Sequence, residues 1–196
     1  MAKSKSARKA VRKAPRANAR RVRYSVAVSL DGFIAAPAGE FDWIIVDPAS
    51  DFAAVFKQFD TFLMGRRTFE VTQQDGAPAM PTGTQTIVFS RTLRQSDYPH
   101  VVITSEVNKT ISTLKKKPGK DIWLFGGGEL FRSVLHAGLI DTIELAVMPI
   151  LLSQGIPLLA AGARSPSLQL TESKTLPSGT VLLSYVVANV RKPKNR

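Results

Sequence analysis

The sequence contains no cysteine and only two histidines. The missing thiol excludes disulfides, thiolate metal sites and a cysteine nucleophile. No apolar run approaches the roughly 18 residues that a membrane-spanning helix needs. The 196 residues, 44% of them hydrophobic, are enough for one globular domain with a sizeable core. We therefore expect a cytoplasmic protein that does not enter a membrane and that holds no metal.

Acidic residues are absent from the first 23 positions, which hold ten Lys or Arg. Residues 191–196 add four more, whereas the span 24–190 has 13 basic and 15 acidic side chains. The net charge of +12 therefore belongs to the two ends of the chain. Because the first end has too few apolar side chains to offset its ordering entropy, we predict a disordered basic tail over 1–21. A folded domain over 22–189 and a second basic tail over 190–196 complete the predicted organisation.

Three roles for the N-terminal tail stay open. It can be a solvated segment with no specific partner. It can attach weakly to nucleic acid or another polyanion, because clustered Lys and Arg release counterions when they bind phosphates. It can also be a cleaved transit peptide, since it is rich in Arg and poor in acids, although it has no clear apolar face.

Strands and helices alternate along the folded span. The predicted strands are 22–30, 61–64, 85–89, 100–104, 121–125 and 139–148. The predicted helices are 52–59, 66–70, 107–114 and 129–138, and the predicted loops are 33–43, 73–84 and 151–159. This alternation predicts an α/β fold with a mostly parallel central sheet and helices on both faces. Residues 168–176 and 180–187 add a C-terminal antiparallel hairpin.

Three of these strands end in residues suited to an anion. Gly126-Gly127-Gly128 opens a helix, whose start carries unpaired N–H groups and about half a positive charge. Residues 65–68 (Gly-Arg-Arg-Thr) and 90–92 (Ser-Arg-Thr) follow two other strands. Each motif alone has an ordinary explanation as a tight turn, a cap or surface arginines. Because ligands of open parallel sheets lie beyond the carboxyl ends of the strands, we expect all three to face one crevice.

A ligand with two separated phosphate groups suits three such motifs, and NADPH has a pyrophosphate and a 2′-phosphate. The glycine run is not G-x-G-x-x-G, and no acid lies roughly 20 residues further on, so a Rossmann fold is disfavoured.

The same segments resemble a known family, the dihydrofolate reductase-like superfamily. The segments that carry this resemblance are 26–34, 63–70, 88–92 and 125–130. Residues 138–141, Pro149 and 152–157 narrow it to the reductase domain of the riboflavin-pathway deaminase/reductase and its stand-alone relatives. The resemblance covers about residues 22–188. It implies a three-layer dihydrofolate reductase-like fold and a homodimer. It also implies NADPH-dependent hydride transfer to a small heterocycle, as in 5-amino-6-(5-phosphoribosylamino)uracil reductase.

The resemblance also implies roles for single residues. The two arginine motifs would hold the adenosine phosphates of NADPH, and the glycine run would carry its pyrophosphate and nearby ribose. Backbone at two further positions would meet the nicotinamide carboxamide. The implied cofactor-binding residues are Ala27, Ile34, Gly65, Arg66, Arg67, Thr68, Ser90, Arg91, Thr92, Gly126, Gly127, Gly128, Glu129 and Leu130.

The sequence departs from the riboflavin enzyme in two ways. No zinc deaminase motif is present, since the chain has neither H-x-E nor cysteine. Phe33 occupies a position that is often Lys or Arg in that enzyme, so no clamp for a ribose phosphate is evident. Ser29, Phe33 and Trp43 are the candidate substrate contacts, and Trp43 is equally suited to anchor its own loop.

Hydride transfer needs a dry pocket and a proton source. Asp51 and Asp31, or a water that they orient, are the candidate donors. Each has an ordinary alternative, Asp31 as a turn residue and Asp51 as a helix cap. His136 and His100 are poor candidates, because one closes a helix and the other opens a strand.

Three further possibilities follow. The domain can have dihydrofolate reductase-type activity, it can bind the nucleotide without turnover, or it can serve a nucleic-acid partner through its tail. The apolar segments 143–148 and 150–160 can supply the implied dimer surface, but burial inside the monomer is equally plausible.

Overall fold

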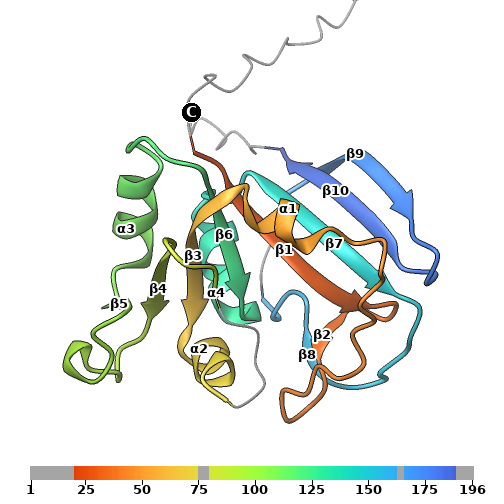
Figure 1. The fold of residues 1–196 in the computed structure, drawn as a ribbon, viewed down its shortest axis with the longest axis horizontal. Helices are drawn as coiled ribbons and strands as arrows, with labels where there is room; N and C mark the ends of the chain where they lie inside the picture. Colours follow the sequence, from red (N-terminus) through yellow and green to blue (C-terminus); the bar gives the residue numbers. More distant parts are fainter. Residues whose placement is uncertain (1–19, 75–79, 163–165, 189–196) are drawn as a thin grey trace, which may run out of the picture.

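The structure is a computed structural model that describes residues 20–74, 80–162 and 166–188. The predicted tails, apart from Arg20 and Arg21, and part of the loop 73–84 lie outside the described residues. An eight-stranded sheet in the order β5-β4-β3-β6-β1-β7-β10-β9 forms the centre of the molecule (Figure 1). Six strands run parallel: β1 (Val22–Ser29), β3 (Phe59–Gly65), β4 (Gln85–Phe89), β5 (Val102–Thr104), β6 (Asp121–Gly126) and β7 (Thr142–Met148).

The hairpin of β9 (Leu168–Thr175) and β10 (Val181–Val187) closes the sheet antiparallel to β7, as the sequence predicts. A separate two-stranded sheet pairs β2 (Phe33–Ala35) with β8 (Ile156–Pro157). A short 3-10 helix, η1 (Gln95–Asp97), connects β4 to β5.

Helices cover both faces of the sheet, so the predicted three-layer α/β fold is confirmed. The helices α3 (Val107–Leu114) and α4 (Gly128–His136) pack on one face, against side chains such as Tyr24, Leu63 and Leu124. The helices α1 (Phe52–Phe56) and α2 (Arg66–Thr72) pack on the other face, against Phe62 and Trp123. Because side chains alternate along a strand, the strands β3, β4 and β6 contribute to both cores.

The sheet opens between β1 and β6 toward the ends of these strands. Their pairing covers only Val22–Tyr24 against Ile122–Leu124, whereas β1 pairs with β7 as far as Ser29. The chain leaves β3 through α2 toward β4 and leaves β6 through α4 toward β7, in opposite directions and on opposite faces. Such a switch point is where open α/β sheets bind ligands.

Several elements differ from their predicted extents. The helix predicted over 52–59 ends at Phe56, because Phe59 is the first residue of β3 and is buried there. The strand predicted over 139–148 begins at Thr142, and the one over 100–104 begins at Val102. The strands β2 and β8 lie inside predicted loops; with three and two residues they are too short to show a period.

Arg20, which the sequence prediction places in the tail, belongs to the folded body. Arg20 is 6% exposed and donates from Nε to the carbonyl of Lys120 and from a guanidinium nitrogen to Thr61 Oγ1, at 2.6 and 2.8 Å. It also pairs with Asp60. In the part of the chain that the structure describes, no helix has the length and apolarity needed to cross a bilayer.

Candidate functional site

The ends of β3 and β6 meet at the switch point. Met64 lies opposite Gly126, and a Cβ placed on Gly126 would meet Thr68 Cγ2 at 3.1 Å and Oγ1 at 3.2 Å. A Cβ on Gly127 would also meet that hydroxyl, at 3.2 Å. The side chain of Thr68 therefore fills the space that side chains at 126 and 127 would need, and only glycine permits this approach.

The starts of α2 and α4 lie side by side as a result. Their N-cap residues are Gly65 and Gly127, and neither helix has a side-chain cap. A Cβ on Gly65 would lie 4.0 Å from the backbone nitrogen of Gly127. Adjacent helix starts without side-chain caps leave backbone N–H groups for an outside acceptor, and the longer helix α4 favours an anion there.

The end of β4 adds a third strand to this edge. Phe89, the last residue of β4, pairs with Gly65 at the end of the neighbouring strand β3. Arg91 comes two residues later and therefore lies one strand away from the start of α2. The sequence prediction that the three strand exits share one edge is confirmed, and their binding roles stay predictions. Ser90 forms the turn itself, because its Oγ accepts from the backbone N–H groups of Thr92 and Leu93 at 3.1 and 3.0 Å.

The arginines of this edge differ in their partners. Arg66 pairs with Glu70 at 2.8 Å, which offsets its charge at the helix start. Arg67 and Arg91 are exposed and form no ion pair with any residue in the described ranges. Two unpaired cations therefore stand beside the helix starts.

The small sheet of β2 and β8 borders the glycine run on its other side. A Cβ on Gly128 would lie 3.0 Å from the carbonyl oxygen of Pro157, and Pro157 pairs with Phe33. Ile34, in the middle of β2, is therefore close to the start of α4 in the fold. Ala27 lies on β1 on the same face as Arg23, the face that α1 covers.

Asp31 holds the turn between β1 and β2. Its carboxylate accepts from Ser29 Oγ at 2.6 Å and from the N–H groups of Leu152 and Ser153 at 3.2 and 2.7 Å. These bonds, the one from Ser29 foremost, hold the pKa of Asp31 below its usual value. Ser29 in turn accepts from the N–H of Phe33 at 2.9 Å. This geometry is that of a structural turn, and a proton-donor role for Asp31 stays a prediction.

The remaining predicted residues also have local partners. Asp51 caps α1 by accepting from Ala54 N at 2.9 Å. Trp43 Nε1 donates to the carbonyl of Glu40 within its own loop at 3.2 Å. Glu129 pairs with Arg132 at 2.6 Å, and Leu130 is buried beside Gly65.

An aromatic cluster that the sequence analysis missed lies on the face that carries α1. The ring of Trp123 lies 5.1 Å from Phe56, 5.7 Å from Phe62 and 5.6 Å from Phe125. Its Nε1 donates to the carbonyl of Ser25 at 2.9 Å, which links β6 to β1 where their pairing has ended. The alternation of Trp123 and Phe125 with Ile122 and Leu124 is the signal that places both rings on one face.

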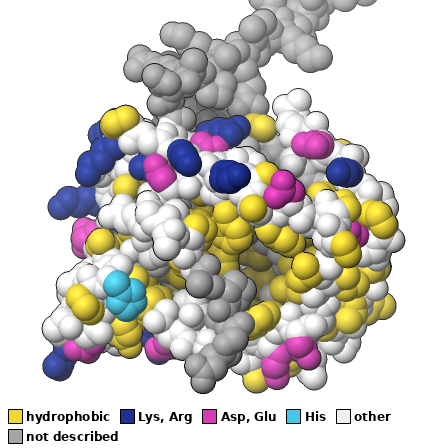
Figure 2. Space-filling model, in the orientation of Figure 1, with side chains coloured by type: hydrophobic (Ala, Val, Ile, Leu, Met, Phe, Trp, Pro, Cys, Tyr) yellow, Lys and Arg dark blue, Asp and Glu magenta, His cyan; other side chains and the backbone are white. Residues whose placement is uncertain are grey.

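Figure 2 shows a hollow on this face, surrounded by hydrophobic side chains, while most Lys and Arg side chains in view lie toward the edge where the strands begin. Phe125, which immediately precedes the glycine run, brings the aromatic cluster to the edge where the two helix starts lie. A charged and an apolar half therefore adjoin at the switch point.

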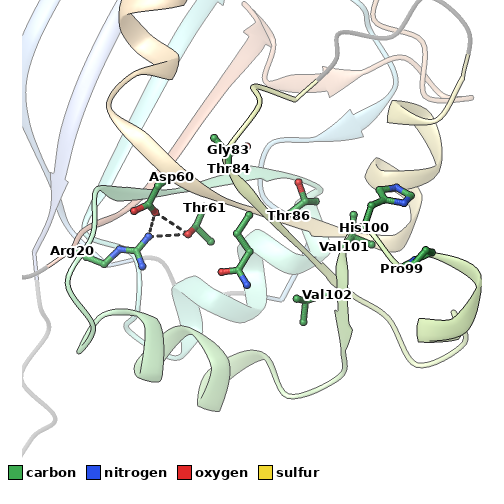
Figure 3. A pocket seen from close by; sticks show the side chains of 11 residues that line it. Arg20, Asp60, Thr61, Gly83, Thr84, Thr86, Pro99, His100, Val101 and Val102 are labelled. Atoms are coloured by element: carbon green, nitrogen blue, oxygen red, sulfur yellow. Dashed lines mark hydrogen bonds and ion pairs between the residues drawn. The ribbon is translucent and has the colours of Figure 1, made fainter.

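A second hollow, of about 520 Å³, lies at the opposite edge, at the start of β3, β4 and β5 (Figure 3). Its lining includes Arg20, Asp60, Thr86 and His100. The buried cation of this hollow, Arg20, already bonds with Asp60 and Thr61, as Figure 3 shows. This hollow therefore offers a ligand less charge than the switch point does.

The residues at the switch point fit a dinucleotide such as NADPH. Close glycine packing, backbone N–H groups without side-chain caps and two unpaired arginines suit phosphates, and the adjoining apolar face suits a flat ring. No cluster of three or more His, Asp or Glu side chains suited to a metal ion occurs within 20–74, 80–162 and 166–188.

Comparisons with known proteins agree with this fold. Residues 20–182 match the model of the RibD C-terminal domain. The uncharacterized protein YyaP of Bacillus subtilis is 34% identical over 177 residues, which cover 85% of this chain and 94% of that protein. The crystal structure of a putative riboflavin biosynthesis protein from Shewanella is 26% identical with a TM-score of 0.72, covering 87% of this chain and 99% of the other.

The deaminase/5-amino-6-(5-phosphoribosylamino)uracil reductase of Thermotoga maritima has the same fold at 16% identity, with a TM-score of 0.63. The match covers 87% of this chain and 57% of the larger one.

Proposed function

The chain belongs to the family of the RibD C-terminal domain, and on this basis we propose that it is a reductase that transfers hydride from NADPH to a small heterocyclic substrate. The observation that carries the proposal is the packing of Gly65, Thr68, Gly126 and Gly127, which joins the two helix starts beside Arg67 and Arg91. A pyrophosphate accepts hydrogen bonds from backbone N–H groups, and a further phosphate pairs with guanidinium groups.

The residues around the cofactor have separate tasks. NADPH, when bound, supplies the hydride. The backbone of Ala27 and Ile34 would orient the nicotinamide, and the aromatic cluster around Trp123 would keep water away from it. Asp51 and Asp31, or a water that they orient, are the proposed proton sources, and each also has a structural partner, Ala54 N for Asp51 and Ser29 Oγ for Asp31.

Calorimetric titration with NADPH and NADH tests the cofactor. We expect NADPH to bind below millimolar concentration, and Arg91→Ala to weaken it about tenfold through loss of a charge-assisted hydrogen bond. Lys117→Ala is the matched control, since it removes the same charge from an exposed position at the opposite edge. Absence of NADPH binding, or equal losses in the two variants, would contradict the proposal.

Turnover separates a reductase from a protein that only binds the nucleotide. Single-turnover oxidation of NADPH, followed at its absorbance band, should occur with the substrate of the riboflavin-pathway reductase, with dihydrofolate or with a related heterocycle. Binding of NADPH without oxidation across such a panel would favour the non-catalytic alternative.

We also propose that the protein is a homodimer. The edge strand β9 is exposed along its whole length and presents Leu168 and Leu170, which are 45% and 50% exposed. Of the segments expected at the dimer surface, β7 is an inner strand with half-exposed faces and Leu151 is 67% exposed. Light scattering of the purified protein tests this, and Leu170→Lys should shift a dimer toward monomer; a monomeric wild type would contradict it.

The basic ends are a second candidate for a function, as a contact for nucleic acid. Val22 N and Val187 N both donate to Asp141, so the first and last strands begin and end together at the edge opposite the cofactor site. The four C-terminal and ten N-terminal Lys or Arg are thus attached to one region. We expect weak binding of duplex DNA that falls steeply with salt and disappears when residues 1–19 are deleted. Binding that survives this deletion would exclude the tail as its cause.

A further inference from the structure

The two halves of the proposed site differ sharply in charge. The exits of β3 and β4 carry Arg66, Arg67 and Arg91. Residues 24–56, which include β1 from Tyr24 onward, β2, the following loop and α1, carry five acids and no Lys or Arg. Residues 133–162, which include β7 and β8, also carry no Lys or Arg. These segments therefore contribute negative charge and no Lys or Arg to the half that adjoins the cofactor half.

The acids of the other half are fixed rather than free to turn away. Asp47 is 3% exposed and accepts from the N–H groups of Ala49 and Ser178 at 2.7 and 2.8 Å. Asp31 is held by three hydrogen bonds, and Asp51 by the start of α1. These three carboxylates are therefore held in place in this half.

The cations nearest to this half in the fold are engaged or distant. Arg23 donates to both carboxylate oxygens of Glu144 at 2.7 and 2.8 Å and to Gln58 at 2.7 Å, and it lies over the ring of Phe59. Lys57 follows α1 and is exposed two residues before β3 starts, at the edge opposite the switch point. Lys174 lies on the edge strand β9, three strands away from Ala27, and its charge acts on Asp47. None of the three lies beside Ala27 and Ile34, where the nicotinamide is proposed to bind.

We infer that this half of the site takes a flat, uncharged heterocycle and rejects one that carries a phosphate group. The inference rests on the proposed function. The partly buried rings of Phe56 and Phe125, which pack on the buried Trp123, offer stacking surface. A phosphate dianion would lose its hydration there, beside segments that carry carboxylates and no Lys or Arg. The substrate therefore differs from the phosphoribosyl compound named for the Thermotoga reductase.

Riboflavin and its 5′-phosphate are a matched probe pair, because they share the ring system and differ only in the phosphate. We measure their dissociation constants by quenching of flavin fluorescence, with NADP⁺ at saturation so that the phosphate-binding half is filled. Riboflavin should bind at least about tenfold more tightly, a difference of about 1.4 kcal/mol. Equal or tighter binding of the phosphate, or no binding of riboflavin, would overturn the inference.

A charge added at position 33 sharpens the test. Phe33→Lys should reduce the ratio between the dissociation constants of riboflavin 5′-phosphate and riboflavin. Phe33→Met, of similar size and uncharged, should leave this ratio unchanged. If both variants change the preference equally, charge is not its cause and the inference fails. Failure of the proposed function has another signature, namely that neither NADPH nor NADP⁺ binds.

Discussion

Arginine and lysine side chains have different partners at the edge where the parallel strands begin and at the edge where they end. Where the strands begin, Arg20, Arg21, Arg23 and Lys115 pair with carboxylates of other elements, mostly far away in the sequence. Where they end, Arg67 and Arg91 form no ion pair within the described ranges. Pairs at the first edge hold strands together. Unpaired cations at the second edge add nothing to folding, which is the arrangement expected where a ligand supplies the missing anions.

We expect the largest effects from glycine substitutions, one at each edge, which should change NADPH affinity at one edge and stability at the other. Gly126→Val places side-chain atoms against Thr68 and drives the two helix starts apart, so we expect NADPH affinity to fall on the order of 100-fold. Adding Thr68→Ala, which removes the contacting atoms, should recover part of the loss. Calorimetry measures both; an unchanged affinity in Gly126→Val would show that the packing is irrelevant to the cofactor.

Gly119→Ala is the counterpart at the other edge. Its φ is +151°, and its new Cβ would lie 2.7 Å from Asp60 Oδ2 and 2.9 Å from Arg20 Cζ. We expect the free energy of unfolding to fall by about 2 kcal/mol, with NADPH affinity unchanged within about twofold.

Asp121→Ala should give the next largest effect, and on stability alone. Asp121 accepts from Arg21 N, Nε and a terminal nitrogen at 3.0, 3.0 and 2.6 Å, and it lies 3.4 Å from Arg23. Its loss leaves three donors of the half-exposed Arg21 unpaired and removes the contact with the partly buried Arg23, so urea unfolding should show a decrease of about 1 kcal/mol. If Asp121→Ala lowers cofactor affinity and leaves stability unchanged, the roles assigned to the two edges are wrong.

The pH dependence of stability should follow the same carboxylate. Burial acts to raise the pKa of Asp121, but hydrogen bonds from Arg21 and the charges of Arg21 and Arg23 hold it below its usual value. Its contribution is therefore present above the unfolded pKa of about 3.9 and is lost as pH falls through the lower folded pKa. The stability difference between wild type and Asp121→Asn should shrink between about pH 5 and pH 2, and a difference that grows in acid would contradict this sign.

Tyr24→Phe should have the smallest effect, in the opposite direction. The Tyr24 ring stacks on Phe131 at 3.9 Å, but its buried hydroxyl has no hydrogen-bond partner among the described residues. Burial raises the pKa of this hydroxyl. Removing the oxygen keeps the stacking and should raise the free energy of unfolding by up to about 1 kcal/mol. A loss of stability would point to a bridging water.

Long, periodic segments of this sequence were sufficient to predict the main sheet, the four helices and the edge where the anion-binding motifs gather. The strands β2 and β8 were not predictable, because each depends on a partner more than 100 residues away in the chain. The sequence analysis missed Trp123 for the same reason, because its position beside a crevice depends on where β1 separates from β6. The helix predicted over 52–59 was too long, because Phe59 fits a helical period while it belongs to a strand.

The hydrogen bonds that Asp141 forms with the first and last strands suggest a circular permutation of the chain. Its backbone and side chain bond with Val22, and its carbonyl accepts from Val187, so the first and last strands meet there. A short peptide could join these two strands, and new termini could be opened in the exposed turn at Gly179. Such a circular permutant should fold and keep the switch point intact, since that point lies at the far side of the sheet from the joined ends.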